Sequence, residues 1–334
     1  MAQENPAIDL SILVVNWNSA NYLKPCLETV YKETHGIQFE TIILDNASYD
    51  GSAELCRDQF PQVKFVQGTE NLGFTKGNNF AYPFTSGRNL LLLNPDTEIR
   101  NGALNKMLAT FESLPNAGAL GCRLLNSDGS VQPSVHAFPT ITNQLIDSDF
   151  LRSHFPQWRI WGMQGSVGDS NVPIEVDAVG GACLLIRRSL FEKIGMLALD
   201  YVMFGDDLDL CYRVKKARQR VYYIGSADVV HHGGKSTASW KQSLSDVWVR
   251  DSTYRFIVKT RGPVYAGVHK TTMAISAAVR LAVVSVVFLL TFSSDRRQRV
   301  IGKLAKWLRV LQWSIGMNDW AQSARRDIGV SPDS

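Results

Sequence analysis

Apolar runs and helical spacings alternate along the first 93 residues of the chain. The run DLSILVV at 9–15 is apolar and β-branched, as a buried strand is, and polar residues follow it. Asn18 and Ser19 are placed to cap a helix that reaches about Tyr31. Further strands are predicted at 41–44, 63–66 and 89–93, with helices that open at Asp50-Gly51-Ser52 and cover 76–84. This order predicts a parallel α/β sheet.

Polar residues follow three of these strands at the point where each strand ends. They are Asn16 to Asn18, Asp45-Asn46 and Asn94 to Asp96. In an open α/β sheet, ligands bind in the crevice at the carboxyl ends of the strands. We therefore expect these side chains to line one binding site.

The pattern changes after residue 125. Residues 126–175 are rich in Ser, Asp, Asn, Pro and Gly and have weak periodicity, so we expect a long excursion that shapes an acceptor site. Regular patterns then return, as a strand at 178–186, helices at 188–194 and 207–217, and a strand at 222–224 that leads to His231-His232.

Residues 274–292 are almost wholly apolar and are interrupted by Arg280. This is close to the roughly 20 residues of a membrane-spanning helix, but the segment is short for a span and contains a charge. A basic cluster at 296–299 follows, with Trp307 and Trp313 beyond it. The pattern favours an interfacial or re-entrant helix over a span. The alternative is a buried C-terminal helix of a soluble domain.

Composition narrows the class of protein. With 334 residues, 45% of them hydrophobic and 20% charged, the chain can bury a sizeable core. The net charge of +4 is modest, but Lys and Arg crowd 213–220 and 295–309, which favours local anionic partners over nucleic acid. Five well-separated cysteines without a CxxC pair indicate a reducing compartment. The polar N-terminus does not resemble a cleaved signal peptide.

The first candidate for chemistry is Asp96, which the strand at 89–93 delivers to the crevice. Mg²⁺ and Mn²⁺ bind one or two protein oxygens and take their other ligands from phosphates and water, so one carboxylate suffices. An Asp that serves only as a turn residue is the alternative.

A second acidic site contains three carboxylates, those of Asp206, Asp207 and Asp209, at the start of the predicted helix at 207–217. With no obvious cation one turn away, their repulsion raises the pKa of at least one and makes it a good general base. They could also be helix N-terminal acids favoured by the macrodipole. His231, after the last strand, is placed to complete a metal site, although a His pair is more often structural.

Several other enzyme classes lack their motifs in this chain. Gly234-Lys235-Ser236 is not a P-loop, because Val229 stands where that motif requires a glycine. No GxGxxG follows the first strand, and GxSxG and HExxH are absent. A nucleotidyltransferase usually carries a Gly-rich, basic loop where this chain has Asn16-Trp17-Asn18-Ser19.

Across residues 9–240 the landmarks occur in an order typical of family-2 glycosyltransferases, which have the GT-A fold. The segments that carry this resemblance are SILVVNWNSANYLKPCLETV, IILDNASYDGS, ENLGFTKGNN, LLLNPDTEI, GGACLLIRRSLFEKIG, FGDDLDLCYRV and VVHHGGKS. Among these enzymes the chain is most similar to bacterial rhamnosyltransferases of cell-surface polysaccharide synthesis. The resemblance implies a mainly parallel, Rossmann-like sheet with flanking helices and a C-terminal helical extension.

The resemblance also implies a role for each matching residue. Asp45 would hydrogen-bond the pyrimidine of the donor, Asp96 would be the final acid of the metal-binding DxD motif, and His231 would support the metal. Asp207 aligns with the catalytic Asp of the usual Glu-Asp-x-Asp, and Asp206 is the next candidate for the base. The other residues assigned to the donor site are Val15, Asn16, Asn18, Asn71, Gly73, Phe74, Gly77, Asn78 and Asn94, the last in place of the first DxD acid.

The function implied is inverting transfer of a sugar, with L-rhamnose from dTDP-rhamnose as the leading candidate, to a lipid-linked saccharide. A UDP-hexose donor and a non-catalytic sugar-nucleotide-binding module are the alternatives. The cofactor would be Mg²⁺ or Mn²⁺, and the protein would lie on the cytoplasmic side of the inner membrane. We expect a catalytic domain at 1–262, with a donor half at 9–120 and an acceptor half at 121–262, and a membrane-associated helical region at 263–334.

Overall fold

The computed structural model describes residues 8–146, 163–164, 171–201, 204–233 and 242–317. Two compact units divide the chain: the first holds 1–138, 156–199 and 206–238, and the second holds 139–155, 200–205 and 239–334. Gly234-Lys235-Ser236 and much of the excursion at 126–175 lie outside the described residues. The domain boundary expected at residue 262 stays a prediction.

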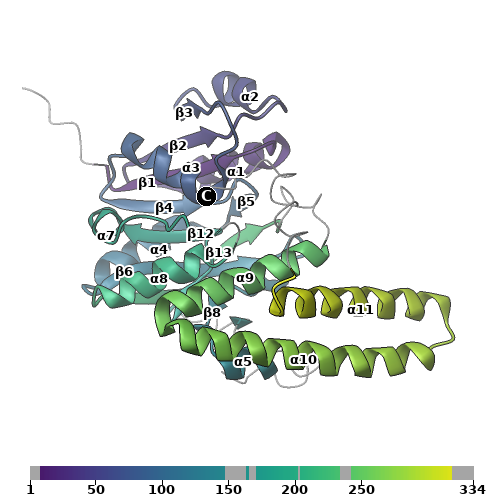
Figure 1. Cartoon of the computed structure of the whole chain (residues 1–334). Helices are drawn as coiled ribbons and strands as arrows, with labels where there is room; N and C mark the ends of the chain where they lie inside the picture. Colours follow the sequence, from purple (N-terminus) through teal and green to yellow (C-terminus); the bar gives the residue numbers. More distant parts are fainter. Residues whose placement is uncertain (1–7, 147–162, 165–170, 202–203, 234–241, 318–334) are drawn as a thin grey trace, which may run out of the picture. The chain divides into compact units, whose positions relative to one another are not determined.

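The first unit is built on a ten-stranded sheet (Figure 1). Its N-terminal half is parallel, as predicted, with the order β3-β2-β1-β4. Its other half is mixed, because β12 runs antiparallel between β4 and β6. The strands are β1 (Leu10–Asn16), β2 (Phe39–Asp45), β3 (Lys64–Gln67), β4 (Asn89–Leu93), β5 (Thr97–Ile99), β6 (Ala117–Leu125), β7 (Val131–Gln132), β10 (Ile174–Val176), β12 (Cys183–Arg187) and β13 (Arg220–His231).

Helices cover both faces of this sheet (Figure 1). Alternate strand residues point to opposite faces, so Ile12 and Val14 belong to one core cluster and Leu13 and Val15 to the other. The first cluster includes α1 (Ala20–Glu33), α2 (Ser52–Gln59) and α4 (Ala103–Ser113). The second includes α3 (Gly73–Ala81), the 3₁₀ turn η1 (Tyr82–Phe84), α7 (Arg188–Lys193) and α8 (Asp206–Lys216). The α/β fold expected from the sequence is confirmed.

Two local predictions need correction. The run at 178–186 is not one strand: the turn at Gly180-Gly181 divides it into β11 (Ala178–Val179) and β12. β11 joins β8 (Val135–His136) and β9 (Met163–Gln164) in a small separate sheet. Ser19 occupies the N-cap position of α1 but makes no capping bond, because its hydroxyl donates to the Trp17 carbonyl. The carboxylate of Asp50 accepts the Ala20 N–H instead, at 2.7 Å.

The second unit is helical in its described residues. It contains α5 (Ile141–Ile146), α9 (Gln242–Arg261), α10 (Pro263–Leu289) and α11 (Ser294–Ser314). Val247 of α9, Met273 and Ala277 of α10, and Val310 and Trp313 of α11 form its core. α10 is long and apolar enough to cross a membrane, yet only 11% of an apolar 18-residue stretch of this helix is buried. That exposure contradicts the alternative of a buried core helix.

We expect Gly121→Ala to destabilise the first unit. A Cβ at this position of β6 would lie 2.5 Å from Cβ of Val179, so β6 or β11 must shift. Overpacking of this kind costs about 1–3 kcal/mol, which urea denaturation will measure. Gly180→Ala is the control, because its Cβ would meet nothing closer than 3.7 Å. Equal stability of the two variants would contradict the close packing.

Candidate active site

The carboxyl ends of β1 and β2 carry a buried polar network. Asn16 and Asp45 lie opposite each other in the parallel register, and Nδ2 of Asn16 donates to Oδ1 of Asp45 at 2.8 Å. The other carboxylate oxygen accepts the Ser48 N–H at 2.8 Å and Nε2 of Gln67 at 2.9 Å. These bonds hold Asp45 and Asn16 in fixed orientations before any ligand binds.

Asn18 ties the loop after β1 to the loop after β2. Its backbone is left-handed, with a φ of 47°, a conformation that Asn tolerates better than most residues. Its Oδ1 accepts the Tyr49 N–H at 3.0 Å, and its own N–H donates to Oγ of Ser48 at 2.9 Å. The two loops are therefore bonded to each other at the carboxyl ends of β1 and β2.

The start of α3 lies against the same strand ends. Oδ1 of Asn71 accepts the Gly73 N–H at 2.9 Å, and the Gly73 carbonyl accepts Nδ2 of Asn46 at 3.2 Å. Gly77 allows the close approach, because a Cβ there would lie 2.9 Å from Cγ1 of Val15.

Within α3, the amide of the buried Asn78 donates to the Phe74 carbonyl at 2.9 Å. This bond uses the N–H of the side-chain amide, whereas its Oδ1 has no partner among the described residues. The residues predicted around the donor thus lie on β1, β2 and α3 or in the loops beside them, except Asn94, which follows β4.

A second group forms where the segment after β4 meets the end of β13, which pairs with β5. Nε2 of His231 lies 3.3 Å from Oδ1 of Asp96 and 3.2 Å from Nδ2 of Asn94. The β5 to β13 pairing sets Thr97 opposite His231 and so fixes this meeting. On its other side, Nδ1 of His231 lies 2.7 Å from Oε1 of Gln132. The structure therefore brings Asn94, Asp96 and His231 together and adds Gln132.

The tautomer of the neutral His231 ring follows from its contact with Gln132. The Gln132 amide is oriented by Nε2, which donates to Asn126 at 2.9 Å, so its Oε1 faces the imidazole and can only accept. In the neutral ring Nδ1 then carries the proton, and the lone pair on Nε2 faces Nδ2 of Asn94 and Oδ1 of Asp96. A lone pair beside a carboxylate is an arrangement that suits a cation.

These donors fit a divalent ion that takes its other ligands from a substrate. Within the described residues, no group of three or more His, Cys, Asp and Glu side chains is placed to hold a metal ion. Asp96 and His231 offer one oxygen and one nitrogen, and a metal with few protein ligands is normal where phosphates complete the shell.

The acidic cluster at the start of α8 divides into different roles. Asp209 is fully buried, and its carboxylate lies 2.6 Å from Nε of Arg213, one turn later. Arg213 also donates to the carbonyls of Ile194 and Met196. The expectation of no cation one turn away is therefore wrong, and Asp209 serves a structural ion pair.

Asp207 is the more accessible of the other two acids. It is half-buried, and its Oδ2 accepts the Gly181 N–H at 3.2 Å. Asp206 is buried, and burial together with the Asp207 carboxylate raises its pKa to about 7. One member of the cluster thus has the raised pKa that the sequence indicated.

The turn between β11 and β12 connects these groups. A Cβ on Gly181 would lie 3.7 Å from Cβ of Asp207 and 4.0 Å from the ring of Phe74. The next residue, Ala182, accepts the Asn94 N–H at 2.9 Å. One turn therefore contacts α3, the end of β4 and the start of α8.

Sequence reasoning missed four residues of this arrangement, namely Ser48, Gln67, Gln132 and Gly181. The Gly180-Gly181 pair after an apolar strand was a usable signal for a turn close to other backbone. No sequence signal marked Gln132, because it lies in the weakly periodic excursion and contacts the site only through His231.

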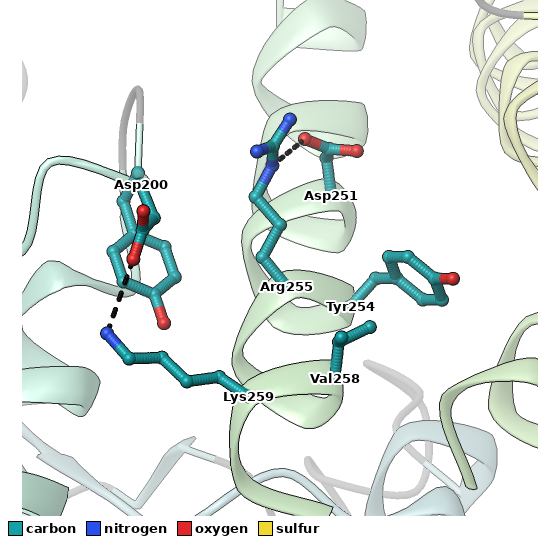
Figure 2. A pocket seen from close by; sticks show the side chains of 7 residues that line it. Asp200, Asp251, Tyr254, Arg255, Val258 and Lys259 are labelled. Carbon is teal, nitrogen blue, oxygen red and sulfur yellow. Dashed lines mark hydrogen bonds and ion pairs between the residues drawn. The ribbon is translucent and has the colours of Figure 1, made fainter. Parts of the chain in front are cut away.

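The second unit has a cavity of its own, of about 600 Å³, over α9 (Figure 2). Figure 2 shows its two ion pairs, Lys259 with Asp200 at 3.3 Å and Arg255 with Asp251 at 2.8 Å. Cations and carboxylates are equal in number, so the cavity has no net charge to select an ion. None of the residues predicted for the site lines it.

Comparisons with known proteins agree on one family. The family described as "Glycosyl transferase family 2" matches residues 11–195. An N-acetylglucosaminyl-diphospho-decaprenol L-rhamnosyltransferase of Mycobacterium tuberculosis is 28% identical over 242 residues, 68% of this chain and 77% of that protein. Rhamnosyltransferase WbbL of Escherichia coli is 24% identical over 75% of this chain and 93% of its own.

A solved structure has a similar fold. The mannosyltransferase PcManGT from Pyrobaculum calidifontis, in complex with GDP-Man and Mn²⁺, superposes with a TM-score of 0.54 and 15% identity. The match covers 98% of this chain and 81% of that one.

We expect stability to depend on pH through Asp206. Since folding raises the pKa of this carboxyl from 3.8 to about 7, its contribution is complete below the unfolded pKa and is lost as pH rises through about 7. Asp206→Asn should flatten the fall in the free energy of unfolding between about pH 4 and pH 7, measured by urea denaturation. Asp58→Asn, at an exposed site, should leave that slope unchanged. An unchanged slope in Asp206→Asn would contradict the assignment.

Proposed function

Because the chain belongs to glycosyl transferase family 2 and is a glycosyltransferase, we propose that it transfers L-rhamnose from dTDP-rhamnose to a lipid-linked saccharide, with inversion. The observation that carries this proposal is the turn at Gly181, which joins Asp207 to the Asn94, Asp96 and His231 group. A transferase needs a base for the acceptor and a holder for the leaving diphosphate within one site. The relatives' names supply the choice of rhamnose and of a lipid diphosphate acceptor.

The donor nucleotide would bind at the rim formed by the β1 and β2 loops and the start of α3. Oδ1 of Asn16 and Oδ1 of Asn46 are buried without a partner among the described residues. An unsatisfied buried acceptor costs about 1–3 kcal/mol, which the N–H of a bound pyrimidine would recover. Asp45 holds Asn16 in place for this contact.

Asp96 and His231 would hold a divalent cation, Mg²⁺ or Mn²⁺, with Gln132 fixing the imidazole tautomer. When bound, such an ion neutralises the charge that develops on the leaving nucleotide diphosphate. The Mn²⁺ in the structure of the Pyrobaculum calidifontis mannosyltransferase supports the choice of a divalent metal.

Asp207 would act as the general base. It removes a proton from the acceptor hydroxyl, and that oxygen attacks the anomeric carbon on the face opposite the diphosphate, so the configuration inverts. Its partial exposure favours it over Asp206, which is buried and shares the local negative charge. General-base assistance contributes about 10²–10⁴ in rate.

The protein would work at the cytoplasmic surface of the inner membrane. A lipid-linked acceptor is presented at a bilayer, and α10 is an exposed apolar helix followed by the basic residues of α11. A membrane surface therefore joins the donor and the acceptor among the proposed partners.

Asp207→Asn should reduce transfer by at least about 10²-fold and leave donor binding unchanged, since the amide cannot accept the proton. Release of nucleoside diphosphate measures turnover, and thermal stabilisation by donor measures binding. Asp200→Asn, in the second unit, is the matched control and should keep its turnover. Near-normal turnover of Asp207→Asn would move the base to Asp206.

Gln132→Leu should weaken Mn²⁺ binding in the presence of dTDP-rhamnose by about 10- to 100-fold, because the His231 tautomer is no longer fixed. Titration of Mn²⁺ against thermal stability measures the affinity. Ser127→Ala is the control, because it removes a partner of His232 and leaves His231 bonded. Equal Mn²⁺ affinity of Gln132→Leu and the wild type would contradict a metal at His231.

The same titration tests the donor. dTDP-rhamnose should stabilise the protein more than UDP-glucose, UDP-galactose or GDP-mannose at equal concentration. Stronger metal-dependent stabilisation by a UDP-hexose would replace rhamnose as the donor. Release of pyrophosphate in place of nucleoside diphosphate would identify a nucleotidyltransferase.

A further inference from the structure

One face of α10 carries an exposed apolar stripe along the whole helix. Its members recur every three, four or seven residues, the spacing of positions on one helical face. Each side chain is between 53% and 81% exposed. We call this set the valine stripe; it consists of Val264, Val268, Ile275, Val279, Val283, Val286 and Leu290.

The opposite face of α10 packs against the protein. Ala266, His269, Met273 and Ala277 are buried and also recur at three- and four-residue spacing. Met273 and Ala277 belong to the core cluster with α9 and α11. α10 is therefore held by one face, and the valine stripe points away from the body of its own unit.

Cations accompany this apolar surface. Residues 263–314 contain eight Lys and Arg residues and one acidic residue, Asp295. Arg296, Arg299 and Lys303 are exposed on α11, which packs beside α10. Long cationic side chains extend to lipid headgroups while their stems contact apolar groups, so the composition suits an anionic bilayer.

We infer that α10 lies flat in the interface of an anionic membrane, on the valine stripe, and does not cross it. This rests on the membrane surface proposed above and specifies how that surface is bound. A helix with one apolar face and one protein-bound face lies in the membrane plane, whereas a spanning helix is apolar all round.

The contacts of Arg280 exclude a span. Near the centre of the apolar segment, its guanidinium donates to the Leu145 carbonyl at 2.9 Å and lies 4.4 Å from the ring of Trp307. A spanning α10 would have to give up these contacts or carry α11, with its six Lys and Arg residues, into the hydrocarbon.

Insertion by the tip of the α10–α11 hairpin is disfavoured for a related reason. Leu289, Leu290 and Phe292 are exposed there, but Arg296 and Arg297 follow at once and would reach the deepest position. Such an orientation would also leave Val264 and Val268, at the other end of the stripe, in water. A flat helix keeps the arginines at the headgroups and covers the whole stripe.

A second copy of the chain is the alternative occupant of the stripe. Two hairpins placed face to face would bring together eight cations from each chain against one acid from each. Like charges at that density oppose association, whereas anionic lipid neutralises them.

Flotation with vesicles tests the stripe. We expect the full chain to bind vesicles of phosphatidylcholine with phosphatidylglycerol, and to bind phosphatidylcholine alone at least tenfold more weakly. Val279→Asp combined with Val283→Asp should reduce binding to the anionic vesicles at least tenfold. Val172→Asp is the matched control, because Val172 is 67% exposed in the first unit, and it should bind as the wild type does. Circular dichroism melts check that each variant is folded.

Depth measurements distinguish the orientations. Val268→Cys, Val279→Cys and Leu290→Cys, made one at a time, accept an environment-sensitive fluorophore selectively because all five native cysteines are buried. The outer two positions are about 33 Å apart along a helix, close to the thickness of the hydrocarbon core. Equal shallow depths support a flat helix. A maximum at 279 would mean a span and a steady increase toward 290 would mean tip insertion, and either would overturn the inference.

The remaining outcomes separate this inference from the proposed function. Transfer to a soluble saccharide acceptor reports on the catalytic site, and vesicle binding reports on the stripe. Transfer by a chain that does not bind vesicles would overturn the inference alone. Self-association abolished by Val279→Asp, without vesicle binding, would assign the stripe to a second copy.

Discussion

The pairing of β4 with the antiparallel strand β12 is the constraint on which the candidate site depends. Leu93 lies opposite Cys183, and the Asn94 N–H donates to the Ala182 carbonyl just beyond the last pair. This register places the turn at Gly181 beside the end of β4, where its N–H reaches the Asp207 carboxylate. Residues about 110 positions apart in the chain thus meet within one connected network. A register shift of one residue would turn the β12 side chains to the other face and separate Asp207 from Asn94.

The polar groups of the site hold one another before any ligand binds. The Asp45 carboxylate accepts hydrogen bonds from Asn16, Ser48 and Gln67. The His231 ring contacts Gln132 on one side and Asp96 on the other. Buried polar groups without partners are costly, so such networks fix orientation and exclude alternatives. Oδ1 of Asn16 and Oδ1 of Asn46 have no partner among the described residues, and burial and the carboxylate of Asp207 oppose the ionisation of Asp206. A buried carboxyl with a raised pKa therefore lies at the start of α8, where the proposed mechanism needs a base.

In the second unit, the two faces of α10 have different surroundings. α10 buries a stripe that contains Met273 and Ala277 and exposes a stripe of valines on the other side. A soluble protein normally keeps contiguous apolar surface small, so an exposed stripe of this length indicates a partner. The Lys and Arg residues of α11, together with Arg280, favour a partner with a negatively charged surface. In the proposals made above, catalysis belongs to the first unit and membrane attachment to the second.

The sequence by itself determined the strands of the N-terminal half, the polar residues at their ends and the apolar character of α10. The spacing of apolar residues in strands and helices involves residues close together in the chain, so these features can be predicted from a short stretch of sequence. Only the tertiary structure decided that β12 is antiparallel and that Gln132 orients His231. It also decided which face of α10 is covered. These features are contacts between packed side chains and between strands distant in the chain, and their geometry exists only once the elements are assembled.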